Sequence, residues 1–364
     1  MNRKTIMIIA GLLVGSLAAY MSQLGNPANM GVCIACFYRD IAGALGLHQA
    51  AVVQYLRPEI MGIALGALIA ALVFGEFRAR GGSSPLLRFL LGAFFMIGAL
   101  VFLGCPVRAV LRLAGGDLNA IAALAGVVVG ALIGIYFLKR GFNLGRANPG
   151  KAVAGWIMPI LMIGLLLLAI AKPAFILYSE QGPGSMFAPL GISLAVGLII
   201  GFLAQRTRMC FVGGWRDLFL VKDTYLFSGI AACFIGAVLV NAITGSINIG
   251  FEGQPVAHTN QLWSFLGMVL AGLTATLLGG CPLRQTILSS EGDTDAGITI
   301  LGMIAGAAFA HNFTLASSGA GPGSFGPVAV IIGLVFACFV GFSMCDKLVL
   351  SARKDTEAGA SIGQ

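Results

Sequence analysis

Charged side chains are scarce in this chain. Asp, Glu, Lys and Arg together make up 10% of its 364 residues, whereas soluble domains carry about 25%. Hydrophobic residues make up 58%, and a water-soluble fold of this length has too little interior to hide so much apolar surface. The scarcity of charge therefore excludes an ordinary soluble domain and favours a protein that lies within a lipid bilayer.

Other scarce features exclude further classes of protein. The three histidines, His48, His258 and His311, are too few and too scattered to indicate a metal site. Residues 145–151 read G-x-x-x-x-G-K, but Ala152 replaces the required Ser or Thr and no strand precedes it, so we expect no P-loop and no ATP-driven pump. No intramembrane Asp or Glu stands alone as a candidate for a proton relay. We expect no cofactor, no catalytic residue and no enzyme.

The rest of the sequence consists mainly of long apolar runs. In none of them do polar and apolar residues alternate as in the strands of an outer-membrane barrel. The runs approach the roughly 20 residues that cross a bilayer. Cys33–Leu47 and Cys210–Leu220 are too short or too polar to span, and we expect re-entrant helices surrounded by protein there. The sequence predicts a single integral membrane domain over residues 1–364, an all-α polytopic protein with about nine or ten transmembrane helices plus short re-entrant helices. The runs are Ile6–Tyr20, Gly62–Phe77, Phe89–Leu103, Ile121–Leu138, Ala152–Ala171, Leu190–Ala204, Leu226–Val240, Leu262–Leu278, Ile298–Ala310 and Val328–Met344.

The two halves of the chain carry the same polar residues in the same order. Cys33 precedes Arg39-Asp40 at the spacing at which Cys210 precedes Arg216-Asp217. Chance similarity between apolar runs would not keep polar residues in register, so we predict two repeats, at about 5–175 and about 187–350. The other matched segments are Gly104-Cys105-Pro106-Val107-Arg108 with Gly280-Cys281-Pro282-Leu283-Arg284, and Gly116-Asp117 with Gly292-Asp293.

Basic residues lie in alternate connections between the runs, whereas Asn241–Gln261 and His311–Pro327 contain no Lys or Arg. By the positive-inside rule, both termini are predicted to be cytoplasmic. This bias accounts for the net charge of +8 without a nucleic-acid partner. Five spans per half is an odd number, so the repeats are predicted to be inverted and pseudo-symmetric, as in secondary transporters. The Cys105 motif then faces the outer side and the Cys281 motif the cytoplasm. The basic residues are Arg3, Lys4, Arg78, Arg80, Arg88, Lys139, Arg140, Arg146, Lys151, Arg206, Arg208, Lys222, Lys347, Arg353 and Lys354.

The Gly-Cys-Pro-x-Arg motif predicts a cysteine at the start of a helix. Pro106 suits the first helical position, where its missing N–H costs nothing, and Gly104 is expected to allow the sharp break before it. Cys105 then sits where free N–H groups and the helix dipole stabilise a thiolate or an anion, and Arg108 adds positive charge one turn on. Residues 280–284 repeat the pattern. A plain helix break, with the cysteine as a small apolar filler, is the alternative.

Further cysteines and two Arg-Asp pairs recur near these motifs. Cys33 and Cys36 form a Cys-x-x-Cys, but Gly213 stands at the matched position of Cys36 in the second half. Arg39-Asp40 and Arg216-Asp217 are expected to be structural ion pairs, because a charge at membrane depth needs a partner. The alternative is that one of these arginines attracts an anionic substrate. Cys233, Cys338 and Cys345 are expected only to pack.

At the paired Gly-Cys-Pro-x-Arg motifs the sequence resembles the YeeE/YedE sulphur-transport family, and residues 32–40 look most like its branch associated with selenium metabolism. The resemblance implies a bacterial inner-membrane protein with an hourglass-like, pseudo-symmetric fold that takes up thiosulphate. It also implies that Cys105, Cys281 and either Cys33 or Cys36 hold the solute briefly through S–H···S contacts. A small TusA-like sulphur-carrier protein is the implied cytoplasmic partner.

The sequence therefore predicts a transporter for a small sulphur- or selenium-containing solute, such as thiosulphate, selenite or selenide. The predicted path runs from Cys33 and Cys105 to Cys281 and Cys210. One alternative is a membrane thiol–disulfide oxidoreductase that uses Cys33 and Cys36, since Cys-x-x-Cys followed by Phe-Tyr-Arg is similar to the pattern of quinone-linked oxidases of the DsbB type. A non-transporting scaffold for selenium metabolism is the other alternative.

Overall fold

The computed structural model describes residues 2–345. Its regular elements are helices, apart from one pair of two-residue strands. Nine helical stretches in this part of the chain are long and apolar enough to cross a bilayer. The predicted all-α polytopic class is thus confirmed, although α3, at 16 residues, is shorter than a full span. The predicted basic residues Lys347, Arg353 and Lys354 lie outside the described residues. The elements are α1 (Arg3–Gln23), α2 (Ile34–Ala44), α3 (Pro58–Val73), β1 (Arg80–Gly81), α4 (Pro85–Phe102), α5 (Pro106–Ala114), α6 (Asn119–Leu138), β2 (Asn148–Pro149), α7 (Ala152–Ala171), α8 (Leu190–Thr207), α9 (Gly213–Leu220), α10 (Tyr225–Ile243), α11 (Gln261–Leu277), α12 (Pro282–Ser290), α13 (Thr294–Asn312) and α14 (Gly326–Ser343).

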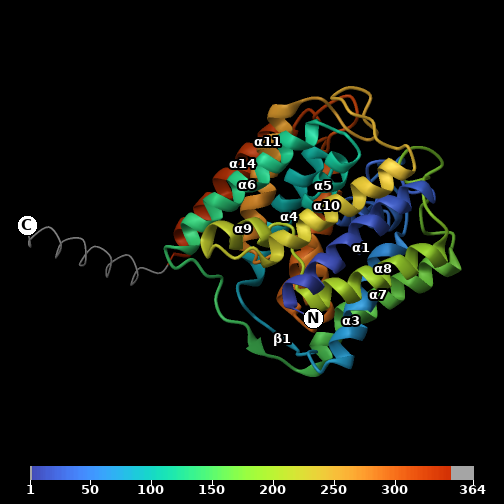
Figure 1. The fold of residues 1–364 in the computed structure, drawn as a ribbon. Helices are drawn as coiled ribbons and strands as arrows, with labels where there is room; N and C mark the ends of the chain where they lie inside the picture. The colour runs from blue at the N-terminus through green and yellow to red at the C-terminus, as the bar shows by residue number, and fades with distance from the viewer. Residues whose placement is uncertain (1, 346–364) are drawn as a thin grey trace, which may run out of the picture.

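Helices from the two halves pack against each other in exchanged pairs. Helix α1 packs on α10 and α8 on α3 (Figure 1), and α6 packs on α11 and α13 on α4. Glycines allow this close approach: a Cβ at Gly15 would collide with the backbone of Cys233, and one at Gly201 with the backbone of Ile63. A two-fold axis between the repeats would relate the α1–α10 pair to the α8–α3 pair, and the α6–α11 pair to the α13–α4 pair. The inverted repeat itself, with its bounds at about 5–175 and 187–350, stays a prediction that this packing supports.

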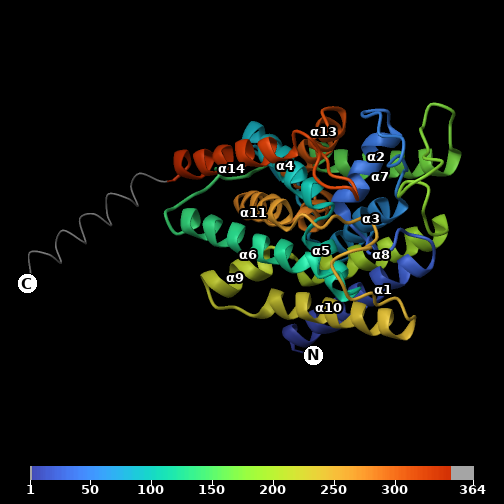
Figure 2. The same ribbon diagram turned by 90° about the horizontal axis from the view of Figure 1, so that it is seen from above.

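Two helices at the perimeter expose long apolar faces. On α7, Val153 is 77% and Leu167 is 61% exposed, and on α14 Val335 and Phe339 are 66% and 67% exposed. Figure 2 shows α10 and α1 along one edge and α13 and α14 along the other, with α5 and α11 between them. Because water would not tolerate so much apolar surface, these faces suit contact with lipid.

Short helices occupy the interior, as expected for re-entrant segments. Every residue of α2 is buried, and so are nearly all residues of α5 and α12. Helix α9 differs, because only Gly213 and Gly214 are buried in it, so the expectation that Cys210–Leu220 is surrounded by protein is wrong for most of this helix. The short helices therefore bring polar residues of both halves into the middle of the fold.

The breaks that precede α5 and α12 follow the predicted pattern with one correction. Pro106 and Pro282 stand at the first helical positions, and the preceding cysteines are the N-caps. The left-handed turn, however, falls at Leu103 (φ 66°) and Gly279 (φ 84°), one residue before the expected glycine. The expectation that Gly104 allows the break through its backbone is therefore wrong.

The motif glycines instead make room for the motif arginines. A Cβ at Gly104 would lie 2.8 Å from Cδ of Arg108, and a Cβ at Gly280 would lie 2.7 Å from Cγ of Arg284. Real Cβ contacts are longer than this, so any larger residue would displace the arginine side chain. The spacing of glycine and arginine in the motif is thus a packing requirement.

Basic connections from distant parts of the chain gather at one end of the helices. Arg206 pairs with Glu76 there at 3.1 Å. At the opposite end, Asn29 donates a hydrogen bond to Gln254 at 3.2 Å. We call the first the basic end and define it by Arg3, Glu76, Arg78, Arg80, Arg206, Arg208 and Glu291. This separation agrees with the alternation of basic and uncharged connections in the sequence. The cytoplasmic orientation of the basic end stays a prediction.

Candidate functional site

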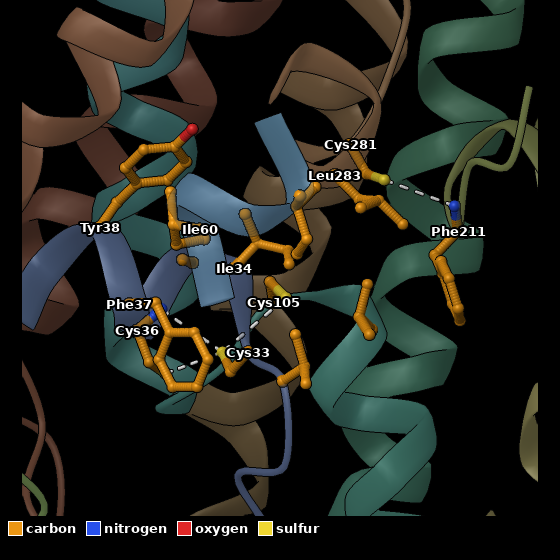
Figure 3. Packing of buried hydrophobic residues seen from close by; sticks show 14 of the residues in the cluster. Cys33, Ile34, Cys36, Phe37, Tyr38, Ile60, Cys105, Phe211, Cys281 and Leu283 are labelled. Atoms are coloured by element: carbon orange, nitrogen blue, oxygen red, sulfur yellow. Dashed lines mark hydrogen bonds between the residues drawn. The ribbon is translucent and has the colours of Figure 1, made fainter. Parts of the chain in front are cut away.

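Three thiols from the first half meet at the starts of α2 and α5. The Sγ atoms of Cys33 and Cys36 lie 2.8 Å apart, and Cys33 Sγ lies 3.8 Å from Cys105 Sγ (Figure 3). All three side chains are fully buried. Cys33 caps α2 by accepting a hydrogen bond from the N–H of Cys36 at 3.4 Å. We call Cys33, Cys36 and Cys105 the three-thiol cluster.

The guanidinium of Arg108 lies against this cluster without a carboxylate. Its Nη1 is 3.5 Å from Cys36 Sγ and also donates to the Leu103 carbonyl. Its Nε and Nη2 donate to the carbonyls of Asn29 and Val256, each at 3.0 Å. Arg108 is fully buried and forms no ion pair with any residue between 2 and 345. An uncompensated buried cation raises the local potential and favours an anion nearby.

Two thiols of the second half meet at the start of α12. The N–H of Cys281 donates to Cys210 Sγ at 3.3 Å. The N–H of Phe211 donates to Cys281 Sγ at 3.4 Å, as the dashed line in Figure 3 marks. Cys210 Sγ also accepts from the N–H of Gly213 at 3.2 Å, the residue that stands in place of Cys36. We call Cys210 and Cys281 the two-thiol cluster. Both sulphur atoms thus lie among backbone donors, which suits a soft, electron-rich ligand.

Apolar side chains separate the two clusters. Ile34 and Leu283 lie between the labelled cysteines in Figure 3, and each is only 1% exposed. The structure therefore brings the predicted path residues into the interior, in a closed arrangement.

A cavity of about 420 Å³ lies next to two of the residues that Arg108 binds. Leu103 and Val256, whose carbonyls accept from Arg108, form part of its wall, together with Arg39 and His311. We call this space the Arg39 cavity. The Ser317 and Ser318 side chains also line it.

Two polar side chains of the Arg39 cavity have nitrogen atoms without a hydrogen-bond partner among the described residues. Arg39 uses Nε and Nη2 to bind Asp40, and its Nη1 forms no hydrogen bond with the described residues. His311 stacks on His48 with ring centroids 4.7 Å apart, and its Nε2 also has no partner in residues 2–345. The expectation that the histidines are scattered is thus wrong for this pair, although no three-residue metal cluster occurs among the described residues. The cavity offers donors that suit an oxyanion.

The two Arg-Asp pairs both form ion pairs, but in different surroundings. Asp40 binds Arg39 at 2.6 Å and also Arg57 at 2.7 Å, and all three side chains are at most 2% exposed. Arg216 and Asp217 pair at 2.7 Å and remain 26% and 22% exposed. The first pair therefore belongs to a buried group with one excess positive charge. Arg57 was not singled out from the sequence because it lies outside the repeated motif.

At the basic end, Arg284 meets a carboxylate that Arg108 lacks. Arg284 Nη1 lies 3.6 Å from Glu291 Oε1, and Arg208 Nη1 lies 3.3 Å from the same oxygen. Arg208 also binds Glu76 at 2.8 Å. Arg208, Glu76 and Glu291 line a cavity of about 290 Å³, which we call the Arg208 cavity.

The carboxyl of Glu76 stays ionised at neutral pH. Burial raises its pKa, but hydrogen bonds from Gln205 and Arg206 and the charge of Arg208 lower the pKa by more, so the net shift is downward. The basic end therefore presents alternating fixed charges that lead from Arg284 to the surface.

The sequence did not single out Glu59, which is fully buried near the start of α3. Its Oε1 accepts hydrogen bonds from Asn26 at 2.8 Å and Ser193 at 3.1 Å, and its Oε2 has no partner. It forms no ion pair within the described part of the chain. The expectation that no acidic residue stands alone is thus wrong. Glu59 precedes the apolar run Gly62–Phe77, so a search confined to the runs passed over it.

Residues 206–356 match a known protein family described as sulphur transport. The resemblance expected from the paired motifs is thereby confirmed for this part of the chain. The matched range contains Cys210 and Cys281 but not the three-thiol cluster. The comparison does not single out the branch associated with selenium.

Two curated relatives match 108 residues each. A thiosulfate transporter, TsuA, of Spirochaeta thermophila is 32% identical over 30% of this chain and 32% of its own length. A thiosulfate transporter, TsuA, of Escherichia coli is 31% identical over 29% of this chain and 30% of its own length. The chain therefore spans about a third of the length of the relatives it matches. Both relatives are named as transporters rather than as enzymes.

Proposed function

We propose that this chain, whose residues 206–356 match the sulphur-transport family, carries a small sulphur-containing anion across a membrane along its buried thiols. One observation carries the proposal: each half of the chain places a buried cysteine, Cys105 or Cys281, at the start of a short interior helix beside a second thiol. A lone cysteine at a helix break would need no such partner. The paired arrangement therefore favours a transport role for these cysteines over the hypothesis that they only fill space at a helix break.

A thiosulphate-like anion fits the chemistry of both clusters. Its terminal sulphur is soft and polarisable and suits contact with thiols, while its oxygens suit Arg39 and His311 in the Arg39 cavity. Each thiol contact is weak, which allows the solute to leave as well as to bind. Selenite and selenide belong to the proposed solute class because selenium is similar to sulphur in size and softness.

The proposed path begins in the Arg39 cavity, passes Cys33 and Cys105, and crosses between Ile34 and Leu283. It continues past Cys281 and Cys210 to the Arg208 cavity. The proposal places the chain in the bacterial inner membrane with both termini in the cytoplasm, since positive charge gathers at the basic end. A TusA-like sulphur carrier is the proposed partner at that end.

Cys33 and Cys36 are expected to differ in importance. Cys33 Sγ is the thiol near Cys105 at 3.8 Å, whereas Cys36 Sγ faces Cys33 and Arg108. The two-thiol cluster has Gly213 in place of Cys36. We expect Cys33→Ala to lose thiosulphate uptake and Cys36→Ala to retain it, measured in proteoliposomes.

A second candidate function, thiol–disulfide exchange, rests on the 2.8 Å separation of Cys33 and Cys36 sulphur atoms. That activity needs both thiols, so Cys33→Ala and Cys36→Ala would then be equally inactive. Differential alkylation with mass spectrometry distinguishes the two: transport keeps both thiols reduced during turnover. A disulfide that forms in proportion to turnover would favour exchange.

The transport proposal is tested by a panel of labelled anions. Purified protein in proteoliposomes should take up thiosulphate faster than protein-free liposomes do. Sulphate, which has the same charge but no soft terminal atom, should not enter. Equal entry of sulphate and thiosulphate would point to a general anion path, and entry of neither would overturn the proposal.

A further inference from the structure

The two motif arginines differ in their counter-ions. Arg108 has no carboxylate within ion-pair distance among residues 2–345, and its donors are used by three carbonyls and Cys36. Arg284 has Glu291 at 3.6 Å, and its Nη1 donates no hydrogen bond to the described residues. Arg108 thus has no carboxylate among the described residues to offset its charge, whereas Arg284 shares the carboxylate of Glu291 with Arg208 and Arg80.

The carboxylate responsible has no counterpart in the first half. Since Gly116-Asp117 matches Gly292-Asp293, the position that matches Glu291 is Gly115. Glu291 is the C-cap of α12 and lies on the same face as Arg284, seven residues earlier. The carboxylate that Arg284 has and Arg108 lacks therefore comes from one position of the repeat.

Glu291 is held loosely and among several cations. Its oxygens lie 3.3 Å from Arg208, 3.6 Å from Arg284 and 4.0 Å from Arg80. None of these is a short ion pair, although Glu291 is only 2% exposed. Glu291 also lines the Arg208 cavity. A carboxylate in this setting can shift between neighbouring arginines without losing its charge partners.

We infer that Glu291 is an internal counter-ion that competes with the transported anion for Arg284 and so promotes its release into the Arg208 cavity. The inference rests on the transport function proposed above. An anion that reaches the two-thiol cluster meets an arginine already bound by a carboxylate, so it binds weakly there and leaves. At the three-thiol cluster no carboxylate competes, so Arg108 attracts the anion.

The test is the kinetics of Glu291→Gln in proteoliposomes. Without the competing charge, the anion should stay longer on Arg284. The KM for thiosulphate uptake and the maximal rate should therefore both fall, each by about fivefold. An unchanged KM would overturn the inference, even if the variant were less stable, because a purely structural role affects stability without affecting KM.

Asp223→Asn is the control. Asp223 is exposed at the same end, lines a different cavity together with Arg206 and Arg208, and forms no ion pair with Arg284. Its KM should equal that of the wild type. A fall in KM as large as that of Glu291→Gln would mean that general charge at the basic end, rather than competition for Arg284, sets release.

A shorter carboxylate keeps the inference testable if Glu291→Gln does not fold. Glu291→Asp retains the charge but draws it away from Arg284, so KM should again fall, and an unchanged KM would contradict the inference.

The wild type serves as the separate test of transport. If the wild type shows no cysteine-dependent uptake, the transport proposal fails, whereas wild-type uptake with unchanged KM in these variants removes only the role of Glu291.

Discussion

Replacing Cys105 with alanine is expected to lower thiosulphate uptake by about tenfold or more while the protein stays folded. Cys105 Sγ is the thiol of α5 that faces Cys33 at 3.8 Å, at the step before the apolar constriction. Loss of a contact that contributes about 1.4 kcal/mol at the highest barrier slows a step about tenfold. Uptake of labelled thiosulphate in proteoliposomes measures the effect.

Cys233→Ala is the control for this prediction. Cys233 is as fully buried as Cys105, but it lies in α10 against α1 and contacts neither thiol cluster. Both substitutions remove one buried sulphur atom and should cost a similar amount of stability, on the order of 1 kcal/mol. Uptake by Cys233→Ala should match the wild type. Equal loss in both variants would show that packing, rather than the thiol path, explains the effect.

Asp40→Asn is expected to destabilise the protein by about 3–5 kcal/mol, because removing one member of a buried ion pair leaves its partner unpaired. Here two cations lose their partner at once, since Asp40 binds both Arg39 and Arg57 in a buried site. Asparagine preserves the shape but not the charge. Thermal unfolding in detergent, followed by tryptophan fluorescence or calorimetry, measures the loss.

The second half provides the comparison for Asp40. Asp217 binds only Arg216, and both side chains are partly exposed. An exposed pair contributes about 0–1 kcal/mol, so Asp217→Asn should leave the unfolding temperature nearly unchanged. Equal destabilisation by the two substitutions would contradict the prediction that the buried ion pairs of Asp40 contribute more to stability than the partly exposed pair of Asp217.

The sequence predicted the features that depend on local chemistry. Proline at the first helical position and cysteine before it gave the starts of α5 and α12 correctly, because these preferences belong to the backbone at that point. The short helices α2 and α9 were likewise expected from their length and polarity. Repetition of the motifs in two halves also indicated which cysteines would be related.

The sequence could not predict contacts between distant segments. Asp40 binds Arg57, which lies on a different element, and Glu291 approaches Arg208 from another helix. Glu59 accepts hydrogen bonds from Asn26, in the connection after α1, and from Ser193, in α8. These partners depend on how the helices pack, and periodicity within one segment carries no information about them.

The role of Gly104 shows a second limit. Glycine before a helix suggests a positive φ, but the backbone takes that conformation at Leu103, whose φ is 66°. The absence of a side chain at Gly104 serves the side chain of Arg108 instead. The sequence indicated only that the backbone breaks there, and the packed structure shows that the glycine makes room for Arg108.

The most direct test of the thiol path is to locate the soft atom of the solute. Selenosulphate has selenium in place of the terminal sulphur of thiosulphate, so anomalous scattering from a crystal soaked with it marks that atom alone. The account predicts selenium in van der Waals contact, about 3.5–4.0 Å, with Cys105 or Cys33 Sγ, or with Cys281 Sγ. Selenium found only at the protein surface, with the same uptake kinetics as thiosulphate, would contradict it.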